Sequence, residues 1–116
     1  MSNVQILHNP RCSKSRQTLQ LLQENSIEPE VIDYLKKPLE EVELVDLKNK
    51  LGVSSYLEMM RPKEAEFKAL GLNKESTEKE LLTALLNTPK LLERPVVING
   101  NKAMIGRPPE NVLTIL

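Results

Sequence analysis

The segment around Cys12 combines the residue types that make a thiol reactive. Cys12 is the single cysteine of the 116 residues. The surrounding run, residues 8–16, holds three basic residues, no acid and two hydroxyl donors: Arg11, Lys14, Arg16, Ser13 and Ser15. Neighbouring cations lower the pKa of a thiol and favour the nucleophilic thiolate. A reactive Cys12 is therefore predicted, over the alternative of an inert cysteine in the core.

His8 is a second candidate for chemistry, four residues before Cys12. A histidine titrates near neutral pH, so His8 could stabilise the thiolate or transfer a proton. The alternative is a histidine that hydrogen-bonds the loop and has no chemical role. The sequence is compatible with both interpretations.

Three arginines each precede a proline, namely Arg61, Arg94 and Arg107. A guanidinium presents a planar fork of donors that matches an oxyanion such as phosphate, sulfate or arsenate. Each arginine could instead be solvated or pair with a nearby acid, for example Glu64 or Glu93. Spacing alone does not decide whether the three arginines meet.

Composition excludes several other classes of protein. The 16 Lys and Arg balance 16 Asp and Glu, and aromatic residues make up 3% without any Trp. A nucleic-acid binder is therefore not expected. One cysteine cannot form an internal disulfide, and one cysteine with one histidine is too few for the usual structural zinc site. The four glycines fit neither common nucleotide-binding fingerprint, so no bound cofactor or metal is expected.

Membrane and export segments are not expected either. No run approaches the roughly 18 apolar residues of a membrane span, and the N-terminus lacks the apolar core of a signal peptide. We therefore expect a cytoplasmic protein.

A strand, a helix and a strand form the predicted scaffold around Cys12. Residues 4–7 are a short apolar run typical of a strand, and residues 13–24 have helical spacing without Gly or Pro. A second strand is expected over residues 31–35, which makes a parallel βαβ unit. Cys12 then lies at the start of the helix, where free amides and the helix dipole favour an anion.

Helices fill the middle of the chain, and strands return at its end. Residues 39–92 are predicted to be all helical, with capping boxes that start at Ser55 and Thr77. Residues 96–98 and 102–105 should form a hairpin, with a type I′ turn at Asn99-Gly100. A last helix is expected over 110–116. The predicted fold is an α/β mixed sheet with the order β-α-β, helical block, β-β-α.

Four segments together resemble the glutaredoxin-coupled arsenate reductase family. They are, in chain order, residues 8–16, the pair Met60-Arg61, residues 93–97 and residues 105–108. The likeness is greatest to short bacterial members that carry Asn-Pro-Arg-Cys-Ser-Lys-Ser-Arg. It implies a thioredoxin-like fold in one domain, residues 1–116, with a helical insertion at about 39–92.

The resemblance also implies roles. Cys12 would be the nucleophile that attacks arsenate, with His8 near its thiolate. Substrate would be bound by four residues: Arg61, Arg94, Arg107 and Ser15. Pro95 would be a cis proline beside the site. The enzyme would be a monomer that uses glutathione as co-substrate and glutaredoxin as protein partner. Better-known members usually have a small residue where Arg11 stands here, and Arg11 and Lys14 could tighten or redirect anion binding.

Two alternatives of a different kind remain. Spx-type regulators share the fold and the Arg-Pro motif but bind RNA polymerase and do not catalyse. They usually carry a Cys-x-x-Cys switch, whereas here Ser15 stands at the second position. The other alternative is a glutathione-linked thiol oxidoreductase that acts on another substrate.

Overall fold

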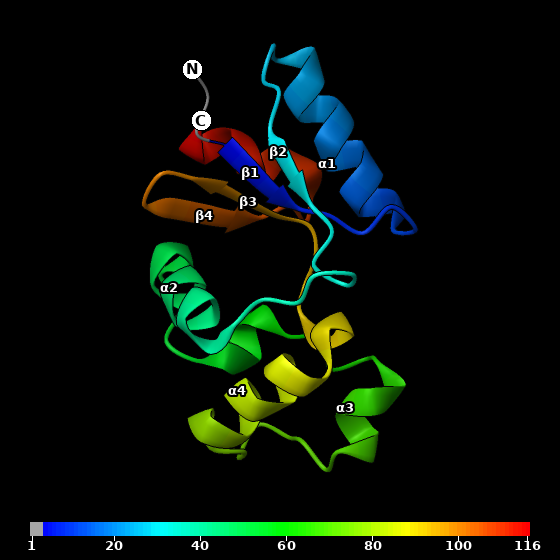
Figure 1. Cartoon of the computed structure of the whole chain (residues 1–116), viewed down its shortest axis with the longest axis vertical. Coiled ribbons are helices and arrows are strands. Elements are labelled where there is room, and N and C mark those ends of the chain that lie inside the picture. The colour runs from blue at the N-terminus through cyan, green and yellow to red at the C-terminus, as the bar shows by residue number, and fades with distance from the viewer. Residues whose placement is uncertain (1–3) are drawn as a thin grey trace. The chain divides into compact units, whose positions relative to one another are not determined.

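A mixed sheet of four strands is the framework of the computed structural model, which describes residues 4–116 (Figure 1). The strands are β1 Val4–Leu7, β2 Glu30–Ile32, β3 Val96–Asn99 and β4 Lys102–Ile105. Their order is β2-β1-β3-β4. β1 pairs in parallel with β2 and antiparallel with β3, and β3 and β4 form an antiparallel hairpin. The mixed sheet and the parallel βαβ unit predicted from the sequence are confirmed.

Contacts divide the chain into two compact units. The first combines Arg94–Leu116 with the N-terminal residues up to Lys37, and the second is Pro38–Glu93. The first unit holds the sheet together with α1 Ser13–Glu24 and the 3-10 helix η3 Pro109–Ile115. The predicted helical block, residues 39–92, falls within the second unit.

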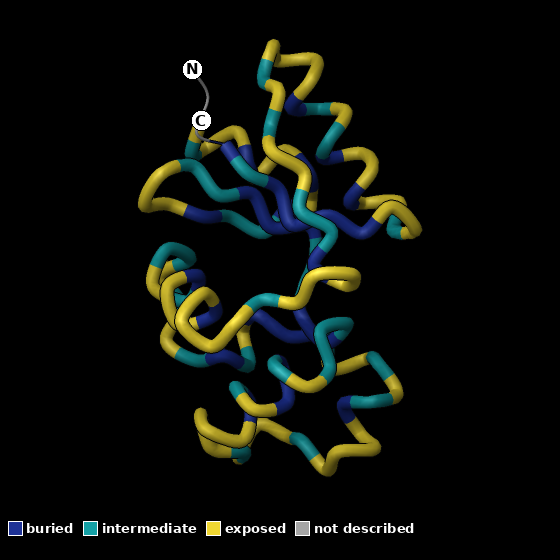
Figure 2. The backbone as a smooth tube through the Cα atoms, viewed as in Figure 1, coloured by how far each residue is buried: buried dark blue, intermediate teal, exposed yellow. Residues whose placement is uncertain are grey.

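One face of the sheet in the first unit is covered by α1 and η3. Ile6 of β1 and Val97 of β3 are paired in register, and both are fully buried. Leu22 of α1 and Val112 of η3 pack against them in one cluster. Figure 2 shows the buried stretches of β1 and β3 running through this part of the chain. This packing fixes where the first turn of α1 lies relative to the end of β1.

The second unit is built from short helices. They are α2 Glu41–Leu51, η1 Tyr56–Met59, α3 Ala65–Ala69, α4 Glu78–Asn87 and η2 Pro89–Leu91. Capping boxes at Ser55 and Thr77 start η1 and α4, as the sequence predicts. Gly52, with φ 71°, ends α2 in the left-handed conformation that glycine adopts readily.

Three elements differ from the sequence-based expectation. β2 ends at Ile32 rather than continuing to residue 35, because Asp33 starts a turn in which its carbonyl accepts the N–H of Lys36. The last helix is a 3-10 helix rather than an α-helix, and it begins at Pro109. The third is α3, in the segment predicted to be all helical, which spans only the five residues Ala65–Ala69.

The hairpin turn is displaced by one residue. Asn99 pairs with Lys102, so the two loop residues are Gly100 and Asn101 rather than Asn99 and Gly100. Gly100 has φ 63°, and Asn101 is not among the residues with positive φ, which fits a type II′ turn rather than the predicted type I′. The Asn99 side chain donates to the Ile115 carbonyl at 2.6 Å, which ties Asn99 to η3 and keeps it in the strand.

Candidate active site

Cys12 is the N-cap residue of α1, as the sequence predicts. Its φ of −92° and ψ of 123° are extended, and the helix begins at Ser13. The loop that leads from β1 is held by its own hydrogen bonds, because the Asn9 side chain accepts the Arg11 N–H at 3.0 Å. The Cys12 N–H donates to the Asn9 carbonyl, also at 3.0 Å. The thiol is therefore presented at a helix start by a loop of defined shape.

The pKa of the Cys12 thiol lies below its ordinary value. Burial alone would raise this pKa, but the backbone N–H groups of Ser15 and Lys14 and the side chain of Arg94 lower it. Backbone amides at a helix start carry partial positive charge and stabilise an anion. Cys12 is only partly buried, so a reagent in solution can reach its thiolate.

Ser15 links His8 to this loop. The Ser15 Oγ lies 2.7 Å from His8 Nδ1 and accepts the Asn9 N–H at 3.0 Å. His8 and Ser15 are both buried. Burial is the main cause that lowers the pKa of His8, Asp33 raises it, and Arg16 lowers it again. The neutral ring is thus favoured, and the Ser15 hydroxyl can donate to Nδ1.

Arg94 and Arg107 both lie beside the Cys12 sulfur. Arg107 Nη2 is 3.7 Å from Cys12 Sγ, and Arg107 Nε donates to the Arg94 carbonyl at 2.8 Å. The Arg94 side chain acts on the same sulfur and on the hydroxyl of Tyr34. Burial would lower the pKa of Arg94, but Tyr34 and Cys12 raise it above its usual value. The guanidinium of Arg94 therefore stays charged.

The peptide bonds that follow these two arginines are both cis. The Arg94-Pro95 bond is cis, which confirms the prediction for Pro95, and the Arg107-Pro108 bond is cis as well. Pro95 also accepts the Gly106 N–H at 2.9 Å through its carbonyl. The two Arg-Pro segments, distant in sequence from Cys12, are thus joined to each other directly.

Arg61 belongs to the second unit, where it pairs with two acids. Its Nε lies 3.3 Å from Glu64 Oε1 and its Nη1 lies 3.4 Å from Glu93 Oε1. This is the alternative that the sequence left open for each arginine. A role of Arg61 in binding an oxyanion remains a prediction.

The group around the sulfur can bind an oxyanion and react with it. Two guanidinium groups and the helix-start amides supply hydrogen-bond donors with positive charge. Such donors match the oxygens of an arsenate or phosphate. A thiolate in such surroundings can act as a nucleophile. His8 is hydrogen-bonded to Ser15 of the same loop, and a catalytic role of His8 remains a prediction.

Tyr34 and Asn9 belong to the site although no sequence pattern singles them out. Tyr34 falls in the segment predicted to be a strand, yet it is 1% exposed and contacts Arg94. No local pattern marks it, because its partner lies far along the chain. Asn9 could have been found, since an Asn before a Pro often caps its own turn through the side chain.

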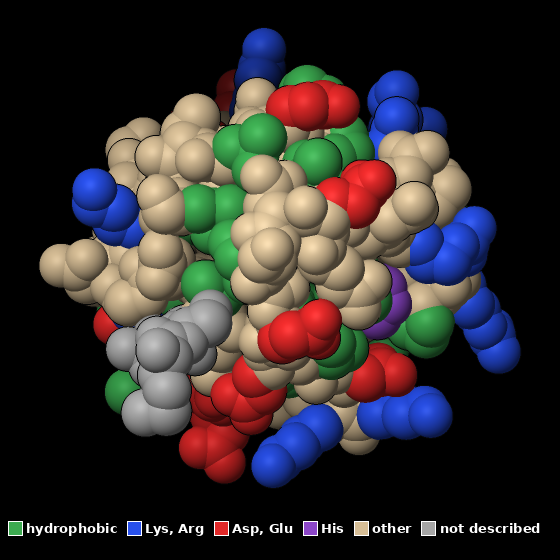
Figure 3. Space-filling view, turned by 90° about the horizontal axis from the view of Figure 1, so that it is seen from above, with side chains coloured by type: hydrophobic (Ala, Val, Ile, Leu, Met, Phe, Trp, Pro, Cys, Tyr) green, Lys and Arg blue, Asp and Glu red, His purple; other side chains and the backbone are tan. Residues whose placement is uncertain are grey.

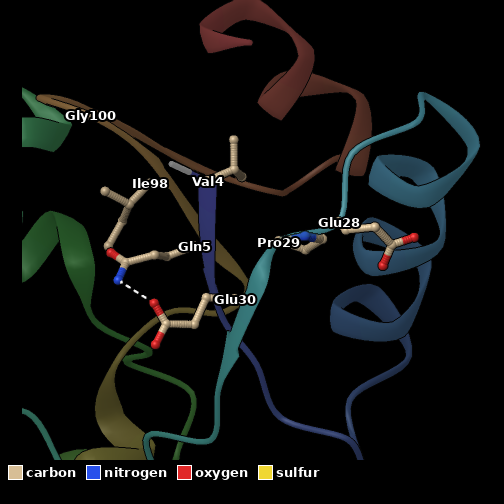
Figure 4. Close-up of a pocket in the computed structure, with 7 residues that line it drawn as sticks. All are labelled: Val4, Gln5, Glu28, Pro29, Glu30, Ile98 and Gly100. Atoms are coloured by element: carbon tan, nitrogen blue, oxygen red, sulfur yellow. Dashed lines mark hydrogen bonds between the residues drawn. The ribbon is translucent and has the colours of Figure 1, made fainter. Parts of the chain in front are cut away.

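The first unit also contains a hollow, which is drawn in Figure 4. Its volume is about 610 Å³. The Gln5 side chain in this hollow donates to the Glu30 carboxylate at 2.9 Å. The Glu28 carboxylate points away from this pair. It lies at the starts of β1 and β2, whereas Cys12 follows the end of β1. Among residues 4–116, no Cys or Arg lines this hollow.

Membrane-spanning helices and metal-binding clusters are both absent from residues 4–116. No helix in that range is long and apolar enough to cross a membrane. No three residues of the types His, Cys, Asp and Glu gather there in a way that could hold a metal ion.

The fold and the site define a thiol-based protein of the thioredoxin-like α/β class, in which the nucleophile caps the first helix and a cis proline lies nearby. The chain belongs to the ArsC family, whose model matches residues 7–115. It is 53% identical to a protein without a functional name, YfgD of Escherichia coli (strain K12), over 97% of this chain and 96% of that one.

Relatives with a functional name share the whole length. An arsenate reductase of Neisseria meningitidis is 47% identical, with 100% of both chains covered. The solved structure of an arsenate reductase from Vibrio cholerae has a TM-score of 0.95 and 45% identity, and covers 99% of this chain and 98% of that chain. These likenesses confirm the predicted family and fold class.

Proposed function

We propose that the protein is an arsenate reductase that uses Cys12 as its nucleophile. The Cys12 thiolate attacks hydrogenarsenate, and an S–As bond forms. One As–O bond breaks, and its hydroxyl takes up a proton from solvent and leaves as water. The thiolate of glutathione then attacks the Cys12 sulfur. An S–S bond forms and the S–As bond breaks with its electron pair on arsenic, which passes from the +5 to the +3 state. Two thiols supply the two electrons and end as a mixed disulfide.

The observation that carries this proposal is a pair of guanidinium groups beside a thiol whose pKa is lowered. Arg107 lies 3.7 Å from the Cys12 sulfur, and Arg94 helps to lower the pKa of the thiol. An enzyme that attacks an anionic substrate such as hydrogenarsenate with a thiolate must offset the repulsion between the two anions. Fixed positive donors do so without reorganisation.

The need for glutathione and glutaredoxin is inferred from the thiol inventory. The chain has one cysteine, and Ser15 stands where a Cys-x-x-Cys partner would be. Cys12 therefore cannot release itself from a mixed disulfide. Glutathione is the abundant small thiol of the cytoplasm, where we propose that the protein acts as a monomer. A glutaredoxin, which recognises glutathione mixed disulfides, would restore the Cys12 thiol by exchange.

The direct test is arsenate-dependent NADPH oxidation with glutathione, glutaredoxin and glutathione reductase present. The wild-type protein should support turnover, and Cys12→Ser should lose it, because a hydroxyl neither ionises near neutral pH nor forms the sulfur adduct. A reaction without arsenate gives the background, and circular dichroism checks that the variant is folded. Turnover by Cys12→Ser at a comparable rate would exclude Cys12 as the nucleophile.

A further inference from the structure

Tyr34 lies in the turn that follows β2, and the backbone holds this turn in place. Just before it, the Ile32 carbonyl accepts the His8 N–H at 2.8 Å, and the Asp33 carbonyl closes the turn by accepting N–H groups further on. His8 begins the segment that leads from β1 to Cys12. The ring of Tyr34 is buried, and protein interiors are close-packed. The hydroxyl at the end of this ring therefore has a fixed place in the structure.

The Arg94 side chain meets this hydroxyl as well as the Cys12 sulfur. Arg94 is half-buried, and its carbonyl accepts a hydrogen bond from Arg107 Nε at 2.8 Å. A bond to the backbone does not by itself fix the guanidinium, because an arginine side chain has many rotamers. A rigid partner for the side chain is needed to keep the guanidinium at the sulfur, and Tyr34 is such a partner.

The chemistry of a phenol suits this task. A hydroxyl oxygen accepts a hydrogen bond from a guanidinium without bringing a negative charge. Arg61 shows the contrast, because its guanidinium is paired with the carboxylates of Glu64 and Glu93, which offset its charge. A carboxylate in place of the Tyr34 hydroxyl would compete with the thiolate for Arg94. A neutral partner leaves the positive charge of Arg94 to act on the thiolate and on a bound anion.

We propose that Tyr34 is a positioning residue, whose hydroxyl holds the guanidinium of Arg94 against the Cys12 sulfur. Tyr34 acts through Arg94 and not on the reacting atoms. The thiolate is then stabilised before a substrate arrives, and Arg94 is already in place to bind an oxyanion. The part of this inference that concerns the oxyanion rests on the proposed function, whereas the part that concerns the thiolate does not.

The test removes the hydroxyl and keeps the ring, in Tyr34→Phe. The rate of Cys12 alkylation by iodoacetamide, followed against pH, gives the midpoint at which half of the thiol is ionised. This midpoint should lie at higher pH in Tyr34→Phe than in the wild type, because a displaced guanidinium lowers the pKa of the thiol less. The shift should not exceed that of Arg94→Gln. In the same variant, kcat/KM for arsenate should fall by about two- to tenfold, the effect of one net hydrogen bond.

Tyr56→Phe is the matched control. Tyr56 is the other tyrosine of the chain, and it is also buried. It lies in the second unit, where Lys48 Nζ is 4.7 Å from the centre of its ring, and phenylalanine keeps that ring. Tyr56→Phe should therefore have the alkylation midpoint of the wild type. Urea denaturation checks that both Phe variants are folded.

A double variant separates positioning from a general effect on the fold. In the Arg94→Gln background, Tyr34→Phe should not move the midpoint further, because the group that Tyr34 holds is no longer there. An equal shift in both backgrounds would mean that Tyr34 does not act through Arg94. An unchanged midpoint in Tyr34→Phe alone would mean that the hydroxyl does not hold the guanidinium. Either result would overturn the proposal.

The outcome is separable from that of the proposed function. A midpoint that Tyr34→Phe raises only when Arg94 is present supports the role of Tyr34 even in a protein without arsenate turnover. Arsenate turnover in the wild type, together with an unchanged midpoint in Tyr34→Phe, leaves the proposed function in place and overturns the role of Tyr34.

Discussion

At Cys12 two effects oppose each other, and their balance predicts how its reactivity depends on pH. Burial raises the pKa of the thiol, whereas the Ser15 and Lys14 amides and Arg94 lower it, and the lowering prevails. Alkylation by iodoacetamide should rise with pH and reach half of its maximal rate below about 8.5, the value for an unperturbed thiol. A wild-type midpoint at or above that value would contradict the site.

Arg94→Gln removes one of the groups that lower this pKa, so its alkylation midpoint should lie at higher pH than that of the wild type. Arg11→Gln is a suitable control, because it removes an exposed cation of the same loop that does not contribute to the pKa. If both variants moved the midpoint equally, the effect would be one of general charge rather than of Arg94.

The geometry of the arginine side chains should matter as well as their charge. Arg94→Lys keeps the positive charge but replaces a planar fork by a point charge. We expect kcat/KM for arsenate to fall by about tenfold to a hundredfold, the effect of losing a charge-assisted hydrogen bond. Arg107→Lys and Arg61→Lys are expected to lose activity too. Near-normal kinetics in all three Lys variants would show that bidentate binding of the oxyanion is not needed.

At the scale of elements, Gly106 lets β4, α1 and the cis proline approach closely. A Cβ at this position would lie 2.7 Å from Thr18 Oγ1 and 2.9 Å from Pro95 Cγ. Gly106→Ala should therefore lower the free energy of unfolding by about 1–3 kcal/mol, as overpacking does. Urea denaturation measures this change through its midpoint.

Thr18→Ala provides the matched test of that explanation. It removes the two Thr18 atoms that a Cβ on Gly106 would meet. In the Thr18→Ala background, Gly106→Ala should cost less than in the wild type, because neighbouring substitutions are not additive. If Gly106→Ala lowered the free energy of unfolding equally in both backgrounds, contact with the Thr18 side chain would not be the cause of the destabilisation.

Elements with a strong local signal could be predicted from the sequence, and those set by tertiary packing could not. β1 and α1 have the predicted bounds, because an apolar run and an uninterrupted helical pattern define them. The predicted position of the hairpin turn was wrong by one residue. The register of the hairpin depends on the hydrogen bond from the Asn99 side chain to the Ile115 carbonyl. β2 is short because the chain turns at Asp33, and Tyr34 in that turn is buried.

The same distinction holds for the site. His8, Cys12 and Ser15 lie within one short segment, so their meeting could be predicted from the loop and the helix start. Arg107 is 95 residues from Cys12, and only the fold brings its guanidinium to the sulfur. The resemblance to a family pointed to Arg94 and Arg107, whereas spacing did not.

At the scale of the whole molecule, charge does not select a large polyanionic partner. The chain has zero net charge. Figure 3 shows both signs of charge on the face that it presents, with hydrophobic side chains in small groups. Two guanidinium groups, those of Arg94 and Arg107, lie at the thiol. This arrangement suits a small oxyanion.

The thiol inventory of the whole chain predicts dependence on external thiols. Reduction of arsenate to arsenite takes two electrons, and two thiols supply them by forming a disulfide. The chain has only Cys12, with Ser15 in place of a resolving cysteine. A second thiol must therefore come from solution, and the lowered pKa of Cys12 makes it a good leaving group when the mixed disulfide is exchanged.

Turnover should accordingly occur with glutathione and glutaredoxin and fail with thioredoxin and its reductase alone. Mass spectrometry of the protein quenched during turnover should find one glutathione on Cys12, and none on Cys12→Ser treated in the same way. Sustained arsenate reduction by thioredoxin without glutathione would exclude this mechanism, because it would require a route that releases Cys12 without a glutathione mixed disulfide. Turnover with glutathione but without any trapped adduct would place the second thiol's attack on arsenic rather than on the Cys12 sulfur.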